Sequence, residues 1–111
     1  MEAKTAKKSQ KICRMLGLAT KARYLVSGGY MTERAIKSGT AKLVIVAEDA
    51  SANTRKSFSD ACNFYQVPIY FFGISTELGQ AMGKEARVSL ALTDTGFAVA
   101  VRKLLDEEAK I

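Results

Sequence analysis

The stretch that decides the fold reads Lys42-Leu43-Val44-Ile45-Val46-Ala47-Glu48-Asp49, and the turn residues Gly39 and Thr40 precede it. Its centre, from Leu43 to Ala47, is an unbroken apolar run that is rich in β-branched residues. Such a run between turn signals is typical of a strand that is buried on both faces in an α/β sheet. The stretch therefore predicts a central strand with helices on either side of the sheet.

Helical and strand patterns alternate on both sides of this strand. Apolar residues recur at helical spacing at about 9–19, 30–38, 53–65, 75–83 and 95–105, and short extended segments fall at 24–26, 67–72 and 88–92. This alternation predicts an α/β fold, a three-layer α-β-α sandwich with a central mixed sheet of about four strands. We expect one domain over residues 9–105, a basic N-terminal tail over 1–8 and a polar, fraying tail over 106–111.

Length and composition narrow the class of protein. The chain has 111 residues and is 48% hydrophobic, which suits one domain with one core. Its longest apolar runs have five residues, against about 18 for a membrane span, and we see no secretory signal. Cys13 and Cys62 lack the spacing of a zinc site and are expected to be two buried thiols. These features predict a cytoplasmic protein without a membrane partner.

The positive charge is concentrated in the first third of the chain. Residues 1–34 hold eight basic and two acidic side chains, which accounts for the whole net charge of +6. One-sided positive charge is the electrostatic footprint of a protein that binds a polyanion. The tail lysines can equally be a solvated extension, whereas Lys21, Arg23 and Arg34 are expected to lie beside a glycine turn and to contact RNA.

That turn, Gly28-Gly29, opens a short basic helix that ends near Ser38. The start of a helix offers free backbone N–H groups, and with Tyr30, Arg34 and Lys37 nearby it forms a phosphate-contacting surface. For Lys37, a phosphate contact and a solvated position remain open. Tyr30 either stacks on an unpaired base or covers the core as a half-buried side chain.

Two other pairs of side chains have structural interpretations. Met31 and Ala35 lie one helical turn apart and are expected to face the core. Glu48 and Asp49 follow the central strand, where they are expected to cap the third helix or to contact an RNA amine.

Catalytic patterns are missing from the sequence. The chain has no histidine, and neither cysteine has a base nearby in sequence. It also contains no G-x-S-x-G, Walker or G-x-G-x-x-G motif. We therefore predict a protein that is not an enzyme, with no cofactor and no metal.

Several sequence blocks resemble the kink-turn-binding ribosomal protein superfamily. They are the block from Gly39 to Ala50, the block Leu78-Gly79-Gln80-Ala81-Met82-Gly83, and Cys62 with Val67-Pro68 further along. Within that superfamily the chain is most similar to the small bacterial YlxQ-type branch, through the segments at 56–65, 83–88 and 93–98. The resemblance covers about residues 12–105.

The resemblance implies a non-catalytic RNA-binding protein that is associated with ribosomes or with structured RNA. In the family, RNA is held by the glycine turn with the start of the second helix, and by the loop before the last strand. Together with the charge pattern, this gives the predicted RNA-binding residues Lys21, Arg23, Gly28, Gly29, Tyr30, Arg34, Lys37, Lys84, Arg87 and Val88.

The chain also departs from the family pattern. Tyr30 and Met31 stand where kink-turn binders carry Asn-Glu, whose side chains read sheared G·A pairs, and Ser75 replaces a lysine. The basic residue one turn further on is retained as Arg34. Keeping phosphate contacts while losing base contacts predicts RNA binding with relaxed base specificity. The alternative is a protein-interaction module on a ribosomal or translation-factor partner.

Overall fold

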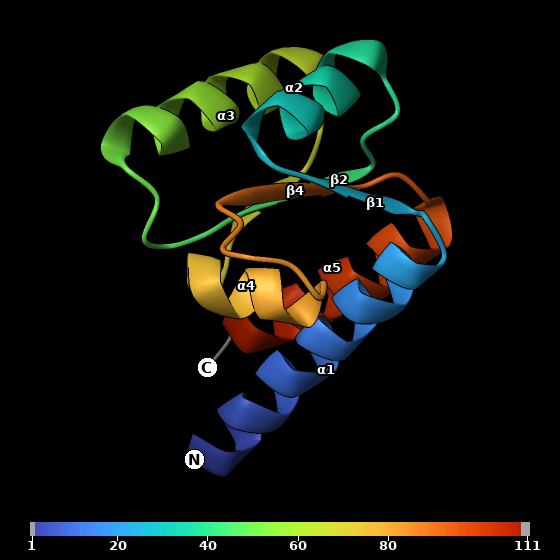
Figure 1. Ribbon diagram of the computed structural model, residues 1–111, viewed down its shortest axis with the longest axis vertical. Coiled ribbons are helices and arrows are strands. Elements are labelled where there is room, and N and C mark those ends of the chain that lie inside the picture. The colour runs from blue at the N-terminus through green and yellow to red at the C-terminus, as the bar shows by residue number, and fades with distance from the viewer. Residues whose placement is uncertain (1, 110–111) are drawn as a thin grey trace.

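The computed structural model describes residues 2–109 of the chain, and the side chains of residues 9–108. The elements follow one another as α1 (Glu2–Lys21), β1 (Leu25–Ser27), α2 (Gly29–Ser38), β2 (Leu43–Val46), α3 (Ala52–Tyr65), β3 (Ile69–Phe71), α4 (Ser75–Ala81), β4 (Ser89–Leu92) and α5 (Thr95–Ala109). Figure 1 shows α2 and α3 on one face of the sheet and α1, α4 and α5 on the other. The predicted three-layer α-β-α sandwich is thereby confirmed.

The sheet is mixed, as predicted, and has the strand order β1-β4-β2-β3. The strand β4 pairs antiparallel with both β1 and β2, so that Leu92 lies between Leu25 and Leu43. The third pair, β2 with β3, is parallel. Because β1, β2 and β3 run in one direction, their ends and the start of β4 lie at one edge of the sheet, which we call the carboxyl edge.

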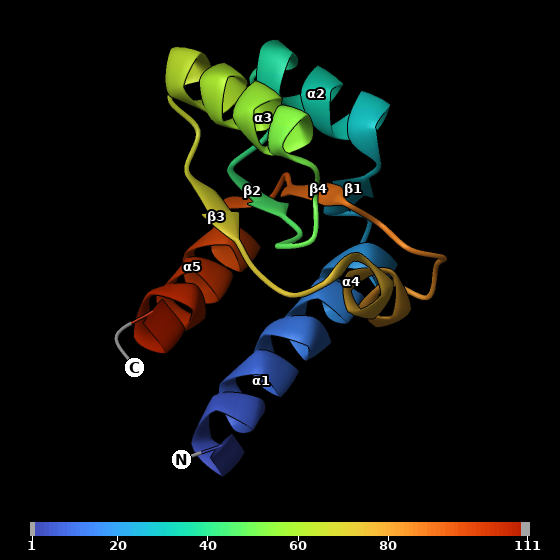
Figure 2. The same ribbon diagram turned by 90° about the vertical axis from the view of Figure 1, so that its left-hand side faces the viewer.

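The apolar run of β2 is buried because both of its faces are covered. Leu43 and Ile45 belong to the core beneath α1, α4 and α5, whereas Val44 and Val46 belong to the core beneath α2 and α3. Successive side chains of a strand point to opposite faces, so every residue of a central strand must be apolar here. Figure 2 shows the two helical layers from the side, with the sheet between them.

Both terminal helices are longer than the sequence pattern predicts. The helix α1 includes residues 2–8 of the expected tail, and α5 continues past residue 105 to Ala109. These extensions contain mostly Ala, Lys and Glu, which favour a helix without an apolar stripe to mark it. The strands differ from their predicted bounds by one or two residues at an end.

Side chains cap the starts of two helices. Ser51 caps α3 by accepting the Thr54 N–H at 3.1 Å, and the Asp94 carboxylate accepts the Phe97 N–H at 2.9 Å at the start of α5. The prediction that Asp49 caps α3 is wrong. Its carboxylate instead holds the start of α4, where it accepts two hydrogen bonds from Ser75.

Candidate nucleic-acid interface

The carboxyl edge brings the glycine turn before α2 next to the loop before β4. The Gly28 N–H donates to the Ser89 carbonyl at 2.9 Å, and the Ala47 N–H donates to the Val88 carbonyl at 2.8 Å. These bonds extend the sheet pairing beyond the strand ends. The two predicted RNA-contacting segments, 28–37 and 84–88, therefore meet at one surface although about 50 residues separate them in sequence.

The glycine turn leaves the start of α2 open to solvent. Gly28 precedes the helix at φ 94° and ψ 157°, and it has no side chain that could cap the helix. The Thr32 N–H donates to the Gly28 carbonyl at 3.0 Å. The N–H groups that precede Thr32 in α2 are those of the first turn, which have no carbonyl partner within the helix. The first turn of α2 also holds no acidic residue. This end of α2 therefore suits an anion.

Two large side chains stand exposed at this helix start. Tyr30 is 72% exposed, which excludes the half-buried position that covers the core. Met31 is 42% exposed, so the prediction that it faces the core is wrong, whereas Ala35 is buried as predicted. The buried stripe of α2 runs through Thr32, Ala35 and Ile36, and Met31 falls beside it.

The basic residues of α2 differ in their partners. The Lys37 Nζ lies 3.1 Å from the Glu33 carboxylate, one helical turn away. Arg34 is exposed and takes part in neither of the two ion pairs found among the described side chains. A shallow hollow along the helix is lined by Tyr30, Glu33, Arg34, Lys37 and Ser38. Arg34 is the cation of this helix that is available to a ligand.

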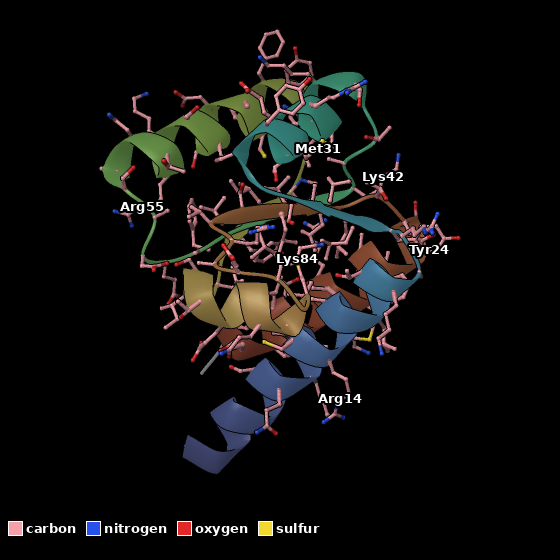
Figure 3. The ribbon with its side chains drawn as sticks, in the orientation of Figure 1. Arg14, Tyr24, Met31, Lys42, Arg55 and Lys84 are labelled. Atoms are coloured by element: carbon pink, nitrogen blue, oxygen red, sulfur yellow. The ribbon has the colours of Figure 1, made fainter. Side chains whose placement is uncertain are left out.

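The loop before β4 is braced by Arg87. Its Nε donates to the Ser27 hydroxyl at 3.2 Å, its Nη1 donates to the Ala86 carbonyl at 3.1 Å, and its backbone N–H donates to the Ser75 carbonyl at 2.9 Å. Arg87 thus joins the loop to the end of β1 and shapes the surface beside Gly28. Lys84 lies on the same loop, is exposed, and is labelled in Figure 3.

The sequence did not identify two residues that position this loop. The Ser27 hydroxyl accepts a hydrogen bond from Arg87, although 60 residues separate the two in sequence. No sequence signal indicates that contact. Gly79 of α4 packs so closely that an added Cβ would collide with the Glu85 carbonyl. The Leu-Gly-x-Ala block contains this glycine, so that motif was the available signal for its role.

Lys21 and Arg23 lie apart from the carboxyl edge. They precede β1, whereas Gly28 follows it, so the length of the strand separates them from the glycine turn. Four residue steps from Tyr24 to Gly28 span about 13 Å in an extended chain. The expectation that Lys21 and Arg23 lie beside the glycine turn is therefore wrong, and only Arg34 of that group lies there.

The two thiols differ in burial. Cys62 is buried, as predicted, and burial raises its pKa to about 11. Cys13 is only half-buried, which differs from the prediction, and burial is again the main reason that its pKa lies above the usual range. Among the described residues no cluster of three or more histidine, cysteine or acidic side chains could hold a metal ion.

Residues 10–101 match the sequence profile of the ribosomal protein L7Ae/L30e/S12e/Gadd45 family. The chain belongs to this family. It is 48% identical over 92 residues to the RNA-binding protein YlxQ of Bacillus subtilis, covering 83% of this chain and 92% of that protein. It is 36% identical over 97 residues to the RNA-binding protein YlxQ of Enterococcus faecium, covering 87% and 93%.

A solved structure has the same fold. It is described as a protein with unknown function from Bacillus halodurans C, and it superposes with a TM-score of 0.84 at 38% identity, covering 86% of this chain and 97% of that one. These likenesses agree with the resemblance that the sequence blocks indicated. Among the described residues, no helix combines the length and hydropathy of a membrane span.

Proposed function

We propose that this protein is a non-catalytic RNA-binding protein that acts on ribosomal or other structured RNA in the cytoplasm. The observation that carries the proposal is the start of α2, where Tyr30 is 72% exposed and the helix end carries no capping side chain. Arg34 stands there outside both ion pairs of the described side chains. A phosphate can bind the helix end and Arg34, and a base can stack on Tyr30. Two YlxQ relatives that are named RNA-binding proteins support this function.

The proposed interface has two parts with different roles. The start of α2, with Gly28, Gly29, Tyr30 and Arg34, holds phosphate and stacks on a base. The loop before β4 adds the charge of Lys84 and the exposed Val88, while Arg87 keeps that loop in position. Lys37 contributes less because Glu33 offsets its charge.

We further propose that base specificity is relaxed. Met31 stands beside Tyr30 at the exposed start of α2 and has no polar group that could read a sheared G·A pair. Phosphate contacts and stacking hold RNA without selecting a sequence. Binding to a kink-turn duplex and to a duplex in which the sheared pairs are replaced should therefore be similar.

The test is an affinity measurement with those two duplexes between 50 and 200 mM salt. We expect similar affinities that fall by about tenfold or more across this range if several phosphates are contacted. Tyr30→Ala should weaken binding by about 1–3 kcal/mol through lost stacking, and Arg34→Gln should lower the salt dependence. Lys37→Gln is the matched control, since its charge is already paired. Equal effects of Arg34→Gln and Lys37→Gln would remove Arg34 from the interface.

A second candidate function is a protein-interaction module on a ribosomal or translation-factor partner. It is favoured by apolar side chains near the same edge, because Met31, Ile74 and Val88 are 42%, 43% and 38% exposed. The discriminating experiment is a pull-down from lysate with and without ribonuclease. A protein partner that persists after ribonuclease treatment would favour this function over direct RNA binding.

A further inference from the structure

The outward face of α1 carries a stripe of basic side chains. Lys11, Arg14 and Lys21 are exposed and follow one another at intervals of three and seven residues, which places them on one face of a helix. The opposite face of α1 is buried and contributes Ile12 and Leu16 to the core. The stretch 9–21 contains no acidic residue, so the stripe is uniformly basic along the described part of the helix.

The basic surface continues beyond the end of the helix. Arg23 lies two residues after the end of α1, and Lys42 precedes β2 at the same end of the sheet. The two positions are linked through β4, because the Thr93 N–H donates to the Tyr24 carbonyl at 2.9 Å and the Lys42 N–H donates to the Leu92 carbonyl at 2.7 Å. Figure 3 shows Tyr24 and Lys42 at one end of the sheet and Arg14 extending away from α1.

We call Lys11, Arg14, Lys21, Arg23 and Lys42 the α1 basic surface. None of them takes part in the two ion pairs found among the described side chains. On another side of α1, Glu108 accepts a hydrogen bond from Ser9 at 3.1 Å, and Glu77 lines a hollow with Cys13. Like charges at these spacings repel one another, so a bound polyanion would relieve the repulsion.

Arg23 lies just after α1 in a left-handed backbone conformation that glycine would adopt more easily. Its φ is 66°, and the Arg23 and Tyr24 N–H groups donate to the Thr20 and Ala19 carbonyls at 3.1 and 2.8 Å. This is the helix-ending pattern in which glycine is usual. Gly39 ends α2 in the same pattern, at φ 84°. Gln66 ends α3 in the same left-handed region, at φ 60°, so this backbone shape is a helix-ending device of the fold, and Arg23 belongs to the α1 basic surface because of its exposed charge.

We propose that the α1 basic surface is a second polyanion-binding site, which contacts the phosphate backbone of RNA. Its helical part, α1, lies on the opposite side of the sheet from α2 (Figure 1), so one molecule can hold two RNA segments, one on each face. The only large apolar side chain exposed between these cations on α1 is Leu18. A helix that binds a membrane surface would need a wider apolar face, so phosphate contact with RNA fits better.

The main experiment measures the salt dependence of binding to an RNA duplex that has no kink-turn. The double variant Arg14→Gln/Lys21→Gln should lower the slope of log affinity against log salt by about 1.4–1.8, the value for two lost phosphate contacts. The matched control is Arg55→Gln/Lys103→Gln, which removes one exposed arginine from α3 and one exposed lysine from α5, both outside the ion pairs found among the described side chains. An equal change of slope in both double variants would overturn the proposal, because overall charge would then explain the effect.

The single variant Arg23→Gly separates binding from folding. Glycine accepts the positive φ without strain, so we expect the thermal midpoint to stay the same or rise while the affinity for RNA falls. Unchanged affinity, or a thermal midpoint that falls with the affinity, would remove Arg23 from the α1 basic surface.

Two further measurements set this site apart from the interface at α2. An immobilised RNA duplex should capture a second, labelled duplex through the wild-type protein, and both Arg14→Gln/Lys21→Gln and Arg34→Gln should abolish the capture. If only Arg34→Gln weakens RNA binding, the α2 interface stands alone and the second site is refuted. If the α1 double variant binds RNA normally but no longer binds phosphatidylserine vesicles, the surface contacts membranes and the proposal fails.

Discussion

The Asp49 carboxylate accepts two hydrogen bonds from Ser75, one from the backbone N–H and one from the hydroxyl, each at 2.9 Å. Asp49 follows β2 and Ser75 begins α4, so the pair joins two elements at the carboxyl edge. The hydroxyl bond first, and then the backbone bond, hold the pKa of Asp49 below its usual range. Both bonds favour the ionised carboxylate, so this contact depends on pH.

We predict that Asp49→Asn destabilises the fold at neutral pH and that the difference disappears in acid. A lowered pKa in the folded state means that the stabilisation is fully present above the unfolded pKa, about 3.9. It is lost as the pH falls through the folded value. Urea unfolding of both proteins at pH 7 and at about pH 2.5 measures this, with Ser75→Ala as the control that removes one donor. A difference that does not change with pH would contradict the prediction.

The two glycines before α2 should respond oppositely to alanine. Gly28 has φ 94° and ψ 157°, a conformation that side-chain-bearing residues avoid, so Gly28→Ala should destabilise by about 1–3 kcal/mol. An added Cβ would meet nothing within 4 Å at either glycine, so the loss comes from the backbone alone. Gly29 begins the helix, and Gly29→Ala should be neutral or stabilise by about 0.5–1 kcal/mol. Thermal unfolding of both variants measures the two effects. Equal destabilisation by Gly28→Ala and Gly29→Ala would contradict the prediction that only Gly28 needs the conformational freedom of glycine.

Thr32 carries a buried hydroxyl that has no hydrogen-bond partner among the described residues. Its side chain belongs to the buried stripe of α2 and is fully buried. Valine has nearly the same shape without the hydroxyl, so Thr32→Val should stabilise the protein by about 1 kcal/mol. Chemical unfolding measures the change, and Thr32→Ser, which keeps the hydroxyl and loses a methyl group, should destabilise. A loss of stability in Thr32→Val would mean that the hydroxyl is bonded in solution.

The fold could be predicted because its signals are local. The apolar run of β2, the helical spacing of Ile12, Leu16 and Ala19, and the glycine that ends α2 each lie within a few residues. Such signals fix which segments form helices and strands and which faces are buried. The sequence did not predict the exposure of Met31, because this residue lies at the margin of the buried stripe of α2. At such a position, helical spacing alone does not decide whether the sheet covers the side chain.

The sequence by itself determined the family, the three-layer fold and the presence of a basic first third. It could not place the charges, because a strand of three residues carries the chain from one end of the sheet to the other between Arg23 and Gly28. Tertiary structure alone joined the glycine turn to the loop before β4, and it separated Lys21 and Arg23 from Arg34. The physical reason is that strand direction and pairing depend on contacts between residues far apart in sequence. These contacts decide which strand ends lie together at one edge of the sheet.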